Sequence, residues 1–167
     1  MATVSGDVPA LHQYTAVAIA GRGVLLSGPP GCGKSSLTLA LIDRGAVLIG
    51  DDGVMLTADG DTVVAAPAPQ TRGLLEIRNV GIVPMECTTA PVALVVRFNY
   101  DAPRYIETVA SEMLAGIAVP HLSMHVSGHA APVRIEQALR LHGLRFEGMV
   151  SPSGGFPNRA GTRRAEG

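Results

Sequence analysis

The sequence predicts an α/β fold in which a strand leads through a glycine-rich loop into a helix. Residues 28–35 read GPPGCGKS and match the pattern GxxxxGK[ST] at every fixed position. An apolar run of strand type, 23–27, precedes this loop, and a run with helical spacing, 37–42, follows it. Further apolar runs of strand length, separated by turn residues, continue along the chain. We therefore expect an α/β fold with a P-loop NTPase-type core.

A hairpin is predicted before the loop and a helix after it. Residues 14–19 and 23–27 read as short strands joined by a glycine-containing turn. The helix begins near Lys34 and ends at Gly45, and because it is apolar on most sides we expect it to be largely buried. Residues 46–50 form a compact apolar run, typical of a buried strand, which we place beside the strand that precedes the loop.

The second half of the chain contains several more strands. The pair Asp59-Gly60 is a strong hairpin signal, and two prolines then interrupt regular structure. We expect strands at 54–57, 62–65, 91–98 and 121–126, a short helix within 104–118 and a helix at 133–141. Residues 1–150 are predicted to form one domain. Residues 151–167 are rich in Gly, Pro, Ser and Arg, which predicts a disordered tail.

Composition excludes several classes of protein. A net charge of −1 argues against binding nucleic acid by general phosphate attraction. No apolar run approaches the ~20 residues needed to cross a bilayer, and the N-terminus has no signal-peptide pattern, so we expect a cytoplasmic protein without a membrane partner. The 2 cysteines, Cys32 and Cys87, suggest neither a disulfide framework nor a zinc site.

The glycine-rich loop has the chemistry of a phosphate-binding site. Glycines at 28, 31 and 33 allow positive φ and bring backbone N–H groups close to an anion. Lys34 adds a positive charge for the β- and γ-phosphates, the Ser35 hydroxyl is a ligand for Mg²⁺, and the helix N-terminus points at the same spot. The nucleotide-binding residues are predicted to be Gly28, Pro29, Pro30, Gly31, Cys32, Gly33, Lys34 and Ser35.

Carboxylates follow the strand at 46–50. Adjacent acids on an extended chain point to opposite faces, so one of Asp51 and Asp52 should face the nucleotide as a metal ligand or base. The alternative is a solvated turn that ends the strand. Glu76 is likewise either a site residue or an edge-strand surface charge, and His12 by itself would be an ordinary histidine.

Several motifs follow one another in a characteristic order. They are a histidine before a short hairpin, the GxxGxGKS loop, an Arg-Gly turn at 44–45, a strand ending in Asp51-Asp52, and LLEIRNVGIV at 74–83. With these gaps, over about residues 11–126, the chain resembles the catalytic domain of the HPr kinase/phosphorylase family, which has RGxxLxADD and LLEIRGLGII at the corresponding places. Without a preceding domain, it is similar to the short alphaproteobacterial form.

The resemblance implies a fold and an activity. The fold is the phosphoenolpyruvate carboxykinase-like variant of the P-loop architecture, a mixed sheet with flanking helices. The activity is ATP-dependent phosphorylation of a serine in an HPr-type phosphocarrier protein of the phosphotransferase system, with Mg²⁺. Many members also remove this phosphate with inorganic phosphate, and members form hexamers. We therefore expect a homo-oligomer.

The resemblance also assigns roles to individual residues. Asp52 matches the acid that accepts the proton of the serine hydroxyl, and Asp51 is its neighbour in the motif. Arg104 follows the strand at 91–98 at about the family's distance. In full, catalytic roles fall on His12, Lys34, Asp51, Asp52 and Arg104, and Mg²⁺ binding falls on Ser35 and Glu76.

Apart from the mild replacement of a glycine by Asn79, this chain departs from the family pattern in three places. Ser36 replaces an acid after the loop serine, and one extra residue separates His12 from the loop. The late PVxxGRN segment, tied to the phosphorylase reaction, reads His125-Val-Ser-Gly-His129 and has no Arg-Asn pair. We therefore expect a bias toward the kinase direction.

Two other functions compete with this interpretation. A nucleotide- or phosphate-sensing regulator without kinase activity needs the loop and a metal site, but not Asp51, Asp52, Glu76 and Arg104 together. A small-molecule kinase of ordinary P-loop type normally has an arginine-rich lid, and no such run precedes the tail.

Overall fold

The computed structural model describes residues 8–148, so the predicted tail at 151–167 and both ends of the predicted domain lie outside the described residues. The elements in chain order are β1 (Ala10–His12), β2 (Thr15–Ile19), β3 (Arg22–Ser27), α1 (Lys34–Asp43), β4 (Val47–Gly50), β5 (Val54–Asp59), β6 (Thr62–Pro67), the short 3₁₀ helix η1 (Pro69–Thr71), β7 (Leu74–Ile77), β8 (Gly81–Pro84), β9 (Ala90–Phe98), β10 (Ala110–Leu114), β11 (Ile117–Met124) and α2 (Ala131–His142). No helix in this part of the chain is both long and apolar enough to span a membrane.

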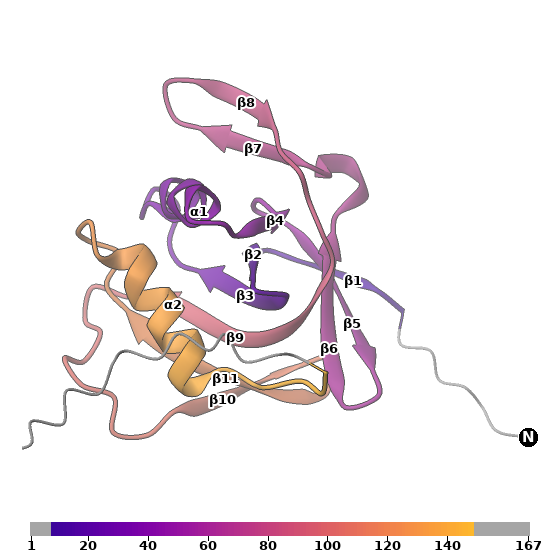
Figure 1. Ribbon diagram of the computed structural model, residues 1–167, viewed down its shortest axis with the longest axis vertical. Helices are drawn as coiled ribbons and strands as arrows, with labels where there is room; N and C mark the ends of the chain where they lie inside the picture. Colours follow the sequence, from indigo (N-terminus) through magenta and orange to yellow (C-terminus); the bar gives the residue numbers. More distant parts are fainter. Residues whose placement is uncertain (1–7, 149–167) are drawn as a thin grey trace, which may run out of the picture.

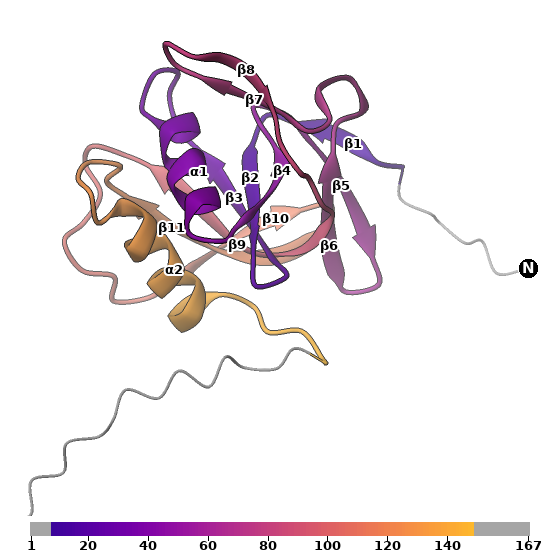
Figure 2. The same ribbon diagram turned by 45° about the horizontal axis from the view of Figure 1, so that its top comes forward.

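A curled mixed sheet forms the centre of the molecule (Figure 1). Its strand order is β1-β5-β6-β9-β3-β2-β4, and β11 adds to β9 and carries β10 at its outer edge. β3 and β11 both pair with β9 in parallel, whereas the other pairs are antiparallel. β7 and β8 form a separate hairpin that lies against α1 (Figure 2). The fold is thus mixed α/β with flanking helices, as predicted.

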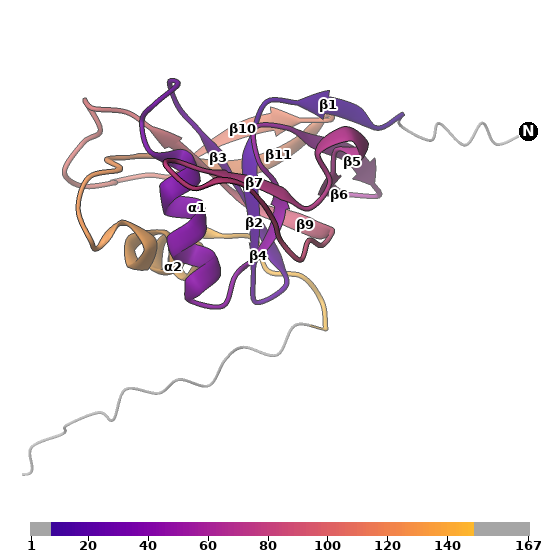
Figure 3. The same ribbon diagram turned by 90° about the horizontal axis from the view of Figure 1, so that it is seen from above.

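Both helices cover one face of the sheet and lie side by side (Figure 3). Leu37 and Leu41 of α1 and Ile135 and Leu139 of α2 pack with apolar side chains of β2, β3, β9 and β11 in one core cluster. A second cluster fills the concave face of the curled sheet. An exposed ion pair between Arg44, which caps α1, and Glu136 of α2 also joins the helices, with N–O distances of 2.7 and 2.9 Å. The two clusters therefore sandwich the strand that carries the glycine-rich loop.

Most predicted elements are confirmed. The one helix that was predicted wrongly is replaced by a hairpin with a two-residue Ala-Gly turn. The hairpin before the loop turns at Ala20-Gly21, where both residues have positive φ. Ala115-Gly116 has the same conformation, and it joins β10 to β11 where a short helix was predicted within 104–118. That prediction was wrong because Ala-Gly was not taken as a hairpin turn.

Two further predictions need correction. β4 does not lie beside β3, because β2 intervenes and pairs with both. A run of apolar residues indicates a buried strand but does not specify which strand it pairs with. α1 is only partly buried, since Leu37, Thr38 and Leu41 are enclosed while Ser36 and Asp43 are exposed. The first strand, β1, was not anticipated.

We expect Ile135→Ala to destabilise the protein by about 3 kcal/mol, because a fully buried side chain leaves a cavity between α2 and the sheet. Chemical denaturation followed by circular dichroism measures the change. Val133→Ala is the control on the same helix, since Val133 is 39% exposed. Equal losses for the two variants would contradict the burial of α2 described above.

Candidate active site

The glycine-rich loop joins the end of β3 to the start of α1. Gly31 and Gly33 have φ values of 76° and 102°, as predicted. Gly28 does not have positive φ, so that part of the prediction was wrong; a Cβ there would lie 3.0 Å from Phe98 Cβ and 3.0 Å from Cys32 Sγ. Gly33 caps α1 without a side-chain hydrogen bond, which leaves N–H groups of the first turn available to an anion.

Lys34 lies against the loop that precedes it. Its Nζ donates to the carbonyl oxygens of Gly28 at 2.8 Å and Pro29 at 3.3 Å. The ammonium group is thus held over the same backbone whose N–H groups would bind phosphate.

Asp51 is the acid that meets the loop. Its Oδ1 accepts hydrogen bonds from Ser35 Oγ at 3.2 Å and Thr15 Oγ1 at 3.4 Å, and its Oδ2 accepts from the backbone N–H of Glu76 at 3.2 Å. The carboxylate therefore joins α1, β2 and β7. It reaches the loop because β2 runs antiparallel to both β3 and β4, which makes β4 parallel to β3, so that both strands end at the same edge.

Asp52 is exposed and has a φ of 55°, so it is not part of an extended strand. Its backbone N–H donates to Thr15 Oγ1 at 3.2 Å. Within residues 8–148 its carboxylate makes no hydrogen bond. One acid of the pair therefore supports the structure beside the loop, and the other extends freely into solvent.

Thr15 was missed by the sequence reasoning. It is only 1% exposed, and its hydroxyl bridges the Asp51 carboxylate and the Asp52 N–H. The available signal was a hydroxyl residue at the start of an otherwise apolar strand. Such a buried hydroxyl needs hydrogen-bond partners, which the two aspartates supply.

Glu76 and His12 lie at the edges of this arrangement. The Glu76 backbone binds Asp51, but its side chain is exposed on β7. His12 pairs with Val54, two residues after Asp52, and its ring stacks on Tyr14 with centroids 6.4 Å apart. In the described part of the chain, no group of three or more His, Cys, Asp or Glu side chains could hold a metal ion by itself.

A second polar group that sequence reasoning missed lies on the concave face of the sheet. Arg97, which pairs with Ser27 just before the loop, forms an ion pair with Glu112 of β10. Tyr14 Oη lies 3.5 Å from the same carboxylate oxygen. Burial raises the pKa of the Tyr14 phenol, and the charge of Glu112 raises it further. These contacts connect β9, β10 and the residue that precedes β2.

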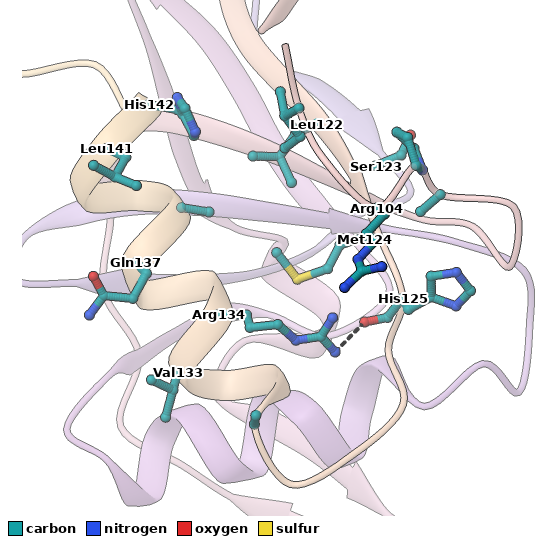
Figure 4. Close-up of a pocket in the computed structure, with 15 residues that line it drawn as sticks. Arg104, Leu122, Ser123, Met124, His125, Val133, Arg134, Gln137, Leu141 and His142 are labelled. Carbon is teal, nitrogen blue, oxygen red and sulfur yellow. Dashed lines mark hydrogen bonds between the residues drawn. The ribbon is translucent and has the colours of Figure 1, made fainter. Parts of the chain in front are cut away.

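Arg104 lies apart from the aspartates. It lines a pocket of about 630 Å³ between β11, α2 and the segment 102–106 (Figure 4). Arg134 lines the same pocket, and its Nη2 donates to the carbonyl oxygens of His125 at 2.8 Å and Ser127 at 2.9 Å. The structure therefore brings together Lys34, Ser35, Asp51 and the Glu76 backbone, while Arg104 forms no hydrogen bond to them.

Comparison with known proteins gives consistent results. The family model described as HPr Serine kinase C-terminal domain matches residues 9–89. The chain is 30% identical over 143 residues to the HPr kinase/phosphorylase of Mycoplasma mycoides, covering 76% of this chain and 46% of that protein. It is 33% identical over 136 residues to the HPr kinase/phosphorylase of Streptococcus sanguinis, covering 72% and 43%. The chain thus spans less than half the length of these curated relatives.

A solved structure shows the same fold. The Hpr(Ser) kinase/phosphatase from Coxiella burnetii superposes with a TM-score of 0.72 and 25% sequence identity. The alignment covers 80% of this chain and 90% of that one.

We expect Thr15→Val to destabilise the protein by about 1–3 kcal/mol, because the Asp52 N–H and the Asp51 carboxylate each lose a buried partner. Thermal and chemical unfolding measure the loss. Thr15→Ser keeps the hydroxyl and should recover most of the stability. A valine variant as stable as the serine variant would show that the hydroxyl bridge contributes nothing.

Proposed function

Because the chain belongs to the HPr kinase family, through its C-terminal domain, we propose that it is an ATP-dependent serine kinase that acts on an HPr-type phosphocarrier protein. The observation that carries the proposal is the contact of Ser35 with Asp51 at 3.2 Å beside the glycine-rich loop. Phosphoryl transfer needs positioned charge and a base rather than covalent chemistry, and this edge of the sheet offers both.

The loop and Lys34 would hold the phosphates of ATP. Backbone N–H groups at the start of α1 bind the phosphate oxygens, and the lysine ammonium offsets their charge. Asp51 keeps the Ser35 hydroxyl in place through its hydrogen bond. The exposed Asp52 is the better placed of the two acids to accept the proton of an incoming serine hydroxyl, because its carboxylate is free.

The donor set at this edge suits Mg²⁺. Ser35 Oγ and Asp51 Oδ1 are hard oxygen ligands, and Mg²⁺ bound with a nucleotide takes its remaining ligands from phosphates and water. Bound there, the ion would neutralise charge on the transferred phosphoryl group. Glu76 would join this set through a rotation of its exposed side chain, since its backbone already contacts Asp51.

His12 and Arg104 complete the proposal. His12 lies on the strand that pairs just beyond Asp52, and this position supports a role for His12 in contacting the acceptor. Arg104 is exposed and would contact the nucleotide from the opposite side. We also propose, from family membership, a cytoplasmic homo-oligomer that is a hexamer.

We predict that Lys34→Ala reduces ATP-dependent phosphorylation of the carrier by about 10²–10³, because one charge contact to the transferred phosphate is lost. Labelled ATP and the HPr-type carrier of the same organism provide the assay. Ser36→Ala is the control on the exposed face of α1. Retention of more than about a tenth of the activity by Lys34→Ala would exclude the loop as the phosphate site.

We also predict that the forward reaction is faster than phosphorolysis of the phosphorylated carrier. The segment 125–129 lacks an arginine, and Arg134, which follows it on α2, already donates to two of its carbonyl groups. Inorganic phosphate should therefore bind poorly. Pyrophosphate release from phosphorylated carrier and phosphate, compared with the forward rate, tests this, and equal rates in the two directions would refute it.

A further inference from the structure

The pocket that contains Arg104 has the size and lining of a ligand site. Its volume of about 630 Å³ lies within the range of ~300–1,000 Å³ that is typical of small-molecule sites. Leu122 and Met124 of β11 and Ala138 of α2 provide apolar walls. Arg104 and Arg134 extend toward Met124 from opposite sides (Figure 4). The site thus combines apolar surface with two guanidinium groups.

The charge of this pocket is entirely of one sign. Its lining contains Arg104, Arg134, His125 and His142 but no Asp or Glu. Within residues 8–148 the ion pairs are Arg44 with Glu136 and Arg97 with Glu112, so neither arginine of the pocket has a carboxylate partner. In a chain with a net charge of −1, such a concentration of positive charge favours an anionic ligand with an apolar body.

The pocket adjoins the glycine-rich loop. A Cβ on Gly33 would lie 3.4 Å from Val126 Cγ1, and Val126 follows the lining residue His125. Arg134 binds the carbonyl groups on both sides of Val126 and so fixes the segment that separates the loop from the pocket.

The two sides of the loop differ in charge. β3, β9 and β11 are parallel, so the loop and the pocket lie at the carboxyl ends of neighbouring strands, where α/β sheets commonly bind ligands. Asp51 and Asp52 lie on the other side, beyond β2 and β4. A nucleotide with its phosphates in the loop would find a pocket that is both basic and apolar on the β9–β11 side.

We infer that this pocket holds the nucleoside end of the bound nucleotide, and that the acceptor serine enters from the side of Asp51 and Asp52. The inference rests on the proposed function, because it requires nucleotide phosphates in the loop. The flat faces of a base would pack on Met124 and Leu122, and the Arg104 guanidinium group would stack on the base or contact the phosphate next to the ribose, while Arg134 keeps its hydrogen bonds to the carbonyl groups of His125 and Ser127.

Calorimetric binding of ADP and of pyrophosphate tests the inference, because pyrophosphate has no nucleoside. Met124→Trp fills the pocket, and Ile106→Glu places a carboxylate at its half-exposed rim. Met113→Trp and Met113→Glu are matched controls, since Met113 is 65% exposed on β10 and does not line the pocket. Circular dichroism checks that each variant is folded.

We expect both pocket variants to weaken ADP binding by about tenfold or more, because each removes burial or guanidinium contact of the base, and to leave pyrophosphate affinity unchanged because pyrophosphate has no base. Both controls should bind ADP within about twofold of the parent chain, as surface substitutions usually do.

Unchanged ADP affinity in both pocket variants would overturn the inference. An equal loss of ADP and pyrophosphate binding in folded protein would also overturn it, because the substitutions would then have altered the phosphate-binding loop and not a nucleoside site. A loss of carrier binding alone would assign the pocket to the protein partner instead. The proposed function can fail independently of this inference. If the variants show the difference between ADP and pyrophosphate binding but the parent chain transfers no phosphate to the carrier, the pocket assignment stands and the proposed kinase activity is wrong.

Discussion

The parallel pairing of β3 with β9 is the contact on which the rest of the structure depends. The two strands lie in the middle of the sheet, buried between a core under the helices and a core on the concave face. Their register sets Ser27 opposite Arg97, so both strands end at the same edge. The loop starts at Gly28, which packs directly on Phe98 of β9. This pair therefore positions the start of the loop that would contact a phosphate.

The acidic side of the site depends on the next two strands. β2 pairs antiparallel with β3 and with β4, which brings Asp51 to the edge where the loop begins. A tight turn then directs this carboxylate: a Cβ on Gly50 would lie 2.3 Å from the Gly53 carbonyl oxygen. Thr15 at the start of β2 completes the arrangement by binding both aspartates. The pairing of β2 with β3 and β4 thus positions the Asp51 carboxylate against Ser35.

The site is divided into two chemically different halves. Carboxylates occupy the β4 side, where in the proposed reaction a hydroxyl would lose a proton and a metal ion would be held. Guanidinium groups and apolar side chains occupy the β9–β11 side, around Arg104 and Arg134. In the proposed kinase, this division would separate the part of the reaction that needs a base from the part that binds the nucleotide. It would also give the nucleotide and the acceptor separate approaches to one loop.

The sequence alone determined the elements that depend on neighbours along the chain. The loop, α1, α2 and the hairpins at Ala20-Gly21 and Asp59-Gly60 follow from local spacing and turn residues, and so does the presence of Lys34 and Ser35 at a helix start. The tertiary structure decided the strand order. It set β4 beside β2, formed a hairpin from 110–124, gave Thr15 its role and placed Arg104 away from Asp51. The physical reason is that strand pairing joins residues distant in sequence, and an apolar run that predicts burial specifies no partner.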